Sequence, residues 1–131
     1  GQGTWQRVGA ATPIRCRVSS TDQLSEALFC YTEMASWSEI DALDRFEQLC
    51  ATVRVSRGWG DCYGHTMVAT GRADLMIDPI MSPWDAAALL PIVQEAGGHF
   101  IGWNGRACID AGNGISVNAF LKDAVFTVLD E

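Results

Sequence analysis

The sequence predicts an α/β domain in which a largely parallel sheet lies between two layers of helices. Strand-like and helix-like segments alternate along its 131 residues, a pattern typical of sheets covered by helices. Short runs that are apolar throughout, such as Leu75-Met76-Ile77, indicate strands buried on both faces. The length fits a single domain over residues 1–131.

Periodicity and turn residues predict the elements in order. Strands are expected where apolar and β-branched residues alternate or run together, over residues 4–8, 14–18, 28–31, 53–56, 75–77, 99–101 and 114–117. A short helix is expected over residues 21–27. The capping-box pattern Ser38-Glu39-Ile40-Asp41 predicts a second helix that continues to Cys50. Further helices are expected over residues 61–70, 83–96 and 120–129, the first of them ended by Gly71.

The start of the helix over residues 83–96 has two interpretations. Ser82-Pro83-Trp84-Asp85 matches a capping box, with serine at the N-cap, proline at the first position and an acid at the third. Alternatively, Asp85 is an ionised ligand, because the positive end of the helix dipole favours a negative charge there. A carboxylate held in this way suits a hard cation such as Mg²⁺.

Composition limits the function classes. The net charge of −7 argues against nucleic acid as a partner, because the chain has no basic stripe. No apolar run is long enough to span a membrane, and residues 1–4 do not resemble a signal peptide. The five cysteines have no metal-site spacing, so a reducing, cytoplasmic location without disulfides is expected.

Several separated blocks, in the right order, resemble the inositol monophosphatase family of Mg²⁺-dependent phosphatases. Trp84-Asp85-Ala86-Ala87 followed by Glu95-Ala96-Gly97-Gly98 is similar to the second signature of that family. The blocks at residues 57–64 and 68–74 resemble the branch that dephosphorylates histidinol phosphate. The resemblance covers nearly the whole chain but only the C-terminal half of such a phosphatase. The first signature, an Asp-Pro-x-Asp-Gly-Thr run that supplies most metal ligands, is missing.

Six residues are candidates for the site, and the resemblance implies the roles of five of them. Asp85 matches a metal ligand, and Asp78 matches a carboxylate that holds a hydroxyl or amine of the substrate. Substrate contacts are implied for the residues Gly60, Asp61 and Cys62, and Arg57 is a candidate anion contact. Asp78 and Asp61 also have structural alternatives, as Asp85 does: Asp78 as a turn residue before Pro79, and Asp61 as a helix cap.

Three hypotheses follow for function. The chain is the C-terminal lobe of a phosphatase for a small phosphorylated alcohol, inactive or weak without an N-terminal lobe. Otherwise it is a non-catalytic small-molecule-binding module, or an oligomerising module, derived from the same fold. Because the lobe would expose an apolar patch without its N-terminal partner, either a separate N-terminal lobe or a homodimer is expected.

Overall fold

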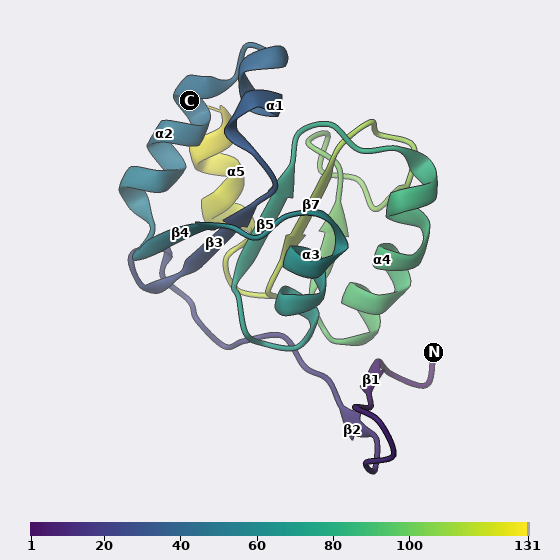
Figure 1. The fold of residues 1–131 in the computed structure, drawn as a ribbon. Helices are drawn as coiled ribbons and strands as arrows, with labels where there is room; N and C mark the ends of the chain where they lie inside the picture. Colours follow the sequence, from purple (N-terminus) through teal and green to yellow (C-terminus); the bar gives the residue numbers. More distant parts are fainter. Residues whose placement is uncertain (131) are drawn as a thin grey trace.

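The computed structural model describes residues 1–130, which form a five-stranded mixed sheet with helices on both faces (Figure 1). The strand order is β4-β3-β5-β7-β6. The strands of this sheet are β3 (Leu28–Tyr31), β4 (Val55–Gly58), β5 (Leu75–Asp78), β6 (His99–Ile101) and β7 (Gly114–Val117). The helices are α1 (Met34–Glu39), α2 (Leu43–Thr52), α3 (Asp61–Ala69), α4 (Pro83–Glu95) and α5 (Lys122–Asp130).

The α/β prediction is confirmed, but the sheet is mixed rather than largely parallel. Strand β3 pairs in parallel with β4 and β5, whereas β7 pairs antiparallel with both β5 and β6. The reason lies in the connections. Helices join β3 to β4 and β4 to β5, as parallel crossovers require, but the segment between β6 and β7 contains no helix. The chain therefore returns beside β6 in the opposite direction.

Alternation along the strands divides the core between the two faces of the sheet. Leu75 and Ile77 of β5 pack on one face with residues of α2 and α5, while Met76 packs on the other face with residues of α3. Helix α4 packs beside α3, on Phe100 of β6. Figure 1 shows α2 and α5 gathered on one side of the sheet and α3 and α4 on the other. The predicted three-layer arrangement is therefore present.

An aromatic cluster fills the core under α1 and α2. Trp37 is fully buried, and its ring lies 5.4 Å from the rings of both Phe46 and Trp103. Phe29 of β3 meets the Trp37 ring edge-on at a centroid distance of 6.3 Å. Contacts of this kind add to the free energy gained by burying large apolar side chains.

The predicted capping box at residues 38–41 is wrong. Ser38 lies in the last turn of α1, and Asp41 has a φ of 57°, a left-handed conformation that cannot continue a helix. The segment predicted as one helix is therefore divided, and α2 begins only at Leu43. The expected helix over residues 21–27 shortens to a 3₁₀ turn, η1 (Leu24–Glu26).

The N-terminal strands form a separate two-stranded hairpin beside α4. Strand β1 (Trp5–Gln6) pairs antiparallel with β2 (Ile14–Arg15). Thr4 anchors the hairpin by donating its hydroxyl to the Ile92 carbonyl at 2.5 Å. Trp5, Val8 and Ile14 remain exposed on it.

Burial makes one cysteine chemically inert. Cys30 of β3 is fully buried, and desolvation, followed by repulsion from Asp74, raises the pKa of its thiol to about 11. Cys62, in contrast, is exposed at the start of α3.

Within residues 1–130, no helix has the length and apolar character needed to cross a membrane.

Candidate functional site

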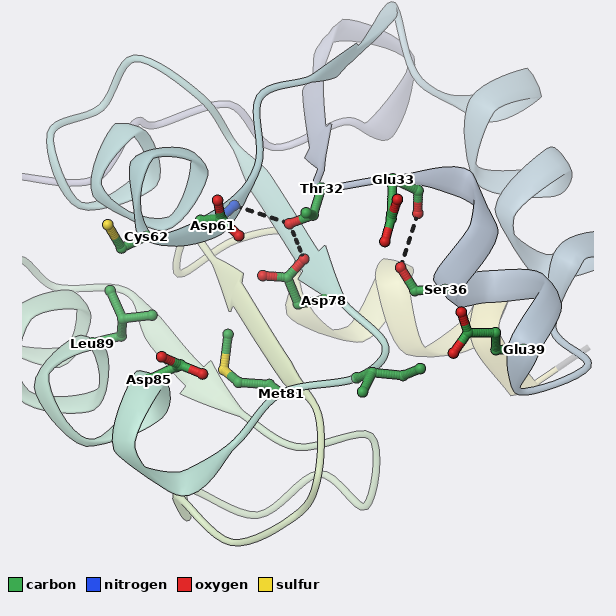
Figure 2. Close-up of a pocket in the computed structure, with 11 residues that line it drawn as sticks. Thr32, Glu33, Ser36, Glu39, Asp61, Cys62, Asp78, Met81, Asp85 and Leu89 are labelled. Carbon is green, nitrogen blue, oxygen red and sulfur yellow. Dashed lines mark hydrogen bonds between the residues drawn. The ribbon is translucent and has the colours of Figure 1, made fainter.

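An acidic pocket of about 430 Å³ lies at the carboxyl ends of the parallel strands (Figure 2). Ligands of open α/β sheets bind at this edge. The pocket is lined by Thr32, Glu33, Ser36, Glu39, Asp61, Cys62, Asp78, Ile80, Met81, Asp85 and Leu89. Five of these residues carry carboxylates and none is a lysine or arginine.

The sheet brings the polar residues together. Thr32 directly follows β3, Asp61 comes soon after β4, and Asp78 ends β5. Because β4, β3 and β5 are adjacent parallel strands, their carboxyl ends lie side by side. Residues separated by more than 40 positions in the sequence, such as Thr32 and Asp78, therefore contact each other directly.

Asp78 is held by hydrogen bonds to both of its carboxylate oxygens. The Thr32 hydroxyl donates to Oδ1, and His65 Nε2 lies 3.1 Å from Oδ2. Only 6% of the Asp78 surface is exposed, although the residue lines the pocket. If Asp78 served only as a turn residue before Pro79, its side chain would not need these two hydrogen-bond partners. The side chain therefore contributes to the pocket itself.

Asp61 is fixed through its backbone. Its N–H group donates to the Thr32 hydroxyl oxygen at 2.9 Å, and its φ of 54° lies in the left-handed region, which is unusual for a residue other than glycine. The N-cap of α3 is Gly60, and the first backbone N–H of the helix is satisfied by the Thr32 hydroxyl rather than by the Asp61 side chain. The alternative role of Asp61 as a side-chain cap is therefore wrong.

Gly60 is required by a close approach of two loops. A Cβ atom at this position would lie 2.6 Å from the Cα of Thr32, closer than two carbon atoms can pack. The glycine therefore allows the loop after β4 to contact the loop after β3. This contact is what places Asp61 beside Thr32.

Asp85 occupies the third position of α4 and faces the acidic pocket (Figure 2). Ser82 is the N-cap by position, but its side chain makes no capping hydrogen bond. The predicted capping box is therefore not formed, and the Ser82 carbonyl accepts the backbone N–H groups of Asp85 at 3.0 Å and Ala86 at 3.2 Å. The carboxylate is exposed and free to meet a ligand in the field of the helix N-terminus.

The described residues do not assemble a complete metal site. Among residues 1–130, no group of three or more His, Cys, Asp or Glu side chains is close enough to hold an ion. Asp85 can supply one carboxylate, but Mg²⁺ needs several oxygen ligands.

The remaining residues considered from the sequence are less central. Cys62 lines the acidic pocket and is exposed, whereas Arg57 lies on β4, outside the lining, and donates to the Ser56 carbonyl at 2.8 Å. Trp59 and Trp84 are exposed, and the Trp59 ring meets the Tyr63 ring edge-on at a centroid distance of 6.3 Å.

Sequence reasoning missed part of the site. Thr32, Glu33, Ser36 and Glu39 line the pocket, but they lie in a loop and a short helix that carry no catalytic or ligand-binding motif. His65 is fully buried against Asp78, a partner thirteen positions away. Side chains alternate between the two faces along β5, so Met76 and Asp78 are predicted to share a face. This alternation was the one sequence pattern that could have indicated a partner for Asp78 on α3.

A second, more open hollow of about 370 Å³ lies between the hairpin and helices α3 and α4. Its lining includes Thr4, Arg7, Arg72 and Ile92. It differs from the acidic pocket in charge, because the charged side chains that line it are the arginines Arg7 and Arg72.

The fold and the cleft together define an α/β protein with an acidic, small-molecule-sized pocket at the carboxyl ends of its parallel strands. A family model of the inositol monophosphatase family matches residues 1–129. The chain therefore belongs to the inositol monophosphatase family.

Curated relatives include several histidinol-phosphatases. The chain is 42% identical over 99 residues to histidinol-phosphatase of Chlorobaculum parvum, covering 76% of this chain and 38% of the relative. It is 35% identical over 130 residues to histidinol-phosphatase of Mycobacterium tuberculosis, covering 99% of this chain and 50% of the relative. The chain thus spans about half or less of the length of these relatives.

Solved structures support the fold. An inositol monophosphatase from Zymomonas mobilis superposes with a TM-score of 0.83 at 24% identity, over 97% of this chain and 53% of that one. An inositol monophosphatase from Thermotoga maritima gives a TM-score of 0.76 at 28% identity, over 89% of this chain and 45% of that one.

Proposed function

We propose that this chain is the substrate-recognising lobe of a Mg²⁺-dependent phosphatase that acts on a phosphorylated amino alcohol of the histidinol-phosphate type. The observation that carries the proposal is the acidic pocket, in which Asp61 and Asp78 are held at the ends of adjacent strands. The histidinol-phosphatase relatives support the same substrate class.

The charge of the pocket favours an amine over a neutral polyol. Five carboxylates line it without a lysine or arginine, so the local potential attracts cations. Histidinol carries an ammonium group at neutral pH, whereas inositol is uncharged. Asp78 and Asp61 would accept hydrogen bonds from the amine, and charge-assisted bonds of this kind are stronger than neutral ones. Gly60 and Cys62 would form the adjoining wall.

We propose Asp85 as the one metal ligand that this segment contributes. Its carboxylate faces the pocket and makes no capping bond with Ser82. Because the described residues do not complete a site, a separate N-terminal lobe is the proposed partner. Arg57 stays a candidate anion contact only if that lobe brings the phosphate towards β4.

The exposed apolar side chains support a partner surface. Trp84 beside the acidic pocket is 79% exposed, and Val8 on the hairpin is 73% exposed. A partner that covered either side chain would remove apolar surface from water, which favours association. A homodimer, in an oligomerising module without catalysis, is the second proposal that these residues support.

The activity test joins the chain to the half of Mycobacterium tuberculosis histidinol-phosphatase that it does not match. With millimolar Mg²⁺, we expect turnover of histidinol phosphate of at least about 1 s⁻¹ for the joined protein, and far less for the chain alone. The joined protein should prefer histidinol phosphate to inositol phosphate. Turnover near 1 s⁻¹ by the chain alone would contradict the need for a second lobe. A preference for inositol phosphate would contradict the substrate class.

Asp85→Asn is expected to remove the effect of Mg²⁺ on the joined protein. An ion that binds only the folded state raises the melting temperature, so the parent should show an increase with millimolar Mg²⁺ and the variant should not. Without Mg²⁺ the variant should lose only about 0.3–1 kcal/mol, from the interaction with the helix dipole.

Asp44→Asn is the matched control for Asp85→Asn. Asp44 is also an exposed acid in the first turn of a helix, α2, but it lies outside the pocket. Thermal unfolding followed by circular dichroism gives the comparison. An equal Mg²⁺ effect in Asp85→Asn and the parent would exclude Asp85 as a ligand.

A further inference from the structure

A buried histidine lies directly behind the acidic pocket. His65, on the second turn of α3, is fully buried, with Nδ1 2.7 Å from Ser116 Oγ and Nε2 3.1 Å from Asp78 Oδ2. The ring packs against Phe100 at a centroid distance of 5.7 Å. A polar ring in such a place costs free energy unless its nitrogens are hydrogen-bonded, and both are.

The partners determine the tautomer of His65. An ionised carboxylate can only accept hydrogen bonds, so Nε2 must carry the proton that is shared with Asp78. In the neutral ring Nδ1 then accepts the hydroxyl proton of Ser116. Ser116 is itself fully buried, which leaves its hydroxyl suited to this one task. The Asp78 carboxylate thus selects the tautomer that donates towards the pocket, and the Ser116 hydroxyl, which can donate or accept, satisfies the other ring nitrogen.

The alternation of the sheet explains why these side chains meet. Met76 and Asp78 of β5 face α3, and Ser116 of β7 is paired with Met76. Ser116 and Asp78 therefore lie on the same face of neighbouring strands, where one ring from α3 reaches both. The arrangement spans three elements and is not a local turn contact.

We infer that His65, oriented by Ser116, is a positioning residue that aims the Asp78 carboxylate at the amine of a bound substrate. His65 holds Oδ2 from behind the pocket while Thr32 holds Oδ1, so rotation of the carboxylate is prevented. Thr32 also accepts the N–H of Asp61, which places both acids in one connected network. The inference rests on the proposed function, because the aimed carboxylate matters only if a cationic group binds there.

Two variants of His65 separate positioning from packing. In His65→Gln the side-chain amide can still donate from near the Nε2 position to Asp78, whereas in His65→Asn the shorter amide reaches only towards Ser116. Both replace the ring by a smaller polar group, so a purely structural role predicts similar losses for both. A positioning role predicts that only the variant without a donor to Asp78 loses ligand affinity.

The measurement is calorimetric titration of the full 131-residue chain with L-histidinol. We expect His65→Asn to weaken binding about tenfold or more, as for the loss of a hydrogen bond to a charged group, and His65→Gln to stay within about threefold. Both variants should show similar reductions in melting temperature. Equal effects of the two variants on affinity, or none, would overturn the inference.

The tautomer provides a second readout that needs no ligand. Long-range proton–nitrogen correlations on the chain, which contains only two histidines, should show His65 protonated at Nε2. A proton at Nδ1 alone would overturn the inference. The two proposals can fail separately. If the joined protein does not hydrolyse histidinol phosphate, but His65→Asn still binds L-histidinol more weakly than His65→Gln does, the proposed function fails and this inference stands. Absence of L-histidinol binding by the parent chain would overturn both.

Discussion

Asp78→Asn is expected to weaken the binding of L-histidinol about 10–100-fold, since a hydrogen bond to a charged group contributes about 1.5–3 kcal/mol. The substitution keeps the shape of the side chain and the acceptor for His65 but removes the negative charge. The effect should be large because Asp78 is only 6% exposed, where solvent screens the attraction weakly. Calorimetric titration at neutral pH measures it.

Glu39→Gln is the matched control for Asp78→Asn. Glu39 also lines the acidic pocket, but its side chain is exposed, so its charge contributes little to affinity. We expect its affinity for L-histidinol to stay within about threefold of the parent. Equal losses in both variants would mean that the pocket attracts cations only through its total charge. An unchanged affinity in Asp78→Asn would exclude Asp78 as the amine ligand.

Trp37→Ala is expected to lower the free energy of unfolding by about 3–5 kcal/mol, the range for removing a large aromatic side chain from a packed core. Trp37 is fully buried between Phe29, Phe46 and Trp103. The substitution leaves a cavity that the surrounding rings, which come from three different segments, cannot close. Because net stabilities are about 5–15 kcal/mol, most of the margin would be lost.

Chemical denaturation followed by far-ultraviolet circular dichroism measures this loss. Trp84→Ala is the control, since the Trp84 side chain is 79% exposed and should cost within about 0.5 kcal/mol. A loss below about 1 kcal/mol in Trp37→Ala would show that the aromatic cluster is not part of the cooperative core.

The sequence predicted the central strands well because their signal is local. Apolar runs such as Leu28–Tyr31 and Leu75–Asp78 are buried from both sides, so composition alone marks them. The orientation of β7 was not predictable from composition, because it depends on the helix-free return after β6. The break between α1 and α2 was missed because the left-handed Asp41 interrupts an otherwise helical pattern.

The candidate site was predictable where a residue lies at the end of a recognisable element. Asp78 ends a strand, Asp61 comes soon after one and Asp85 lies in the first turn of a helix, and all three line one pocket. Thr32 and His65 were missed, since their roles arise from contacts across the sheet and between loops. Local spacing cannot predict such contacts, because they depend on which strands are neighbours.

The most direct test of the central claim is to locate bound L-histidinol on the chain. Backbone amide shifts, recorded in proton–nitrogen correlation spectra during titration, should change at Thr32, Asp61, Cys62 and Asp78, the residues at the carboxyl ends of β3, β4 and β5. Changes confined to the hollow beside the hairpin, around Arg7 and Arg72, or no changes at all, would contradict recognition by the acidic pocket.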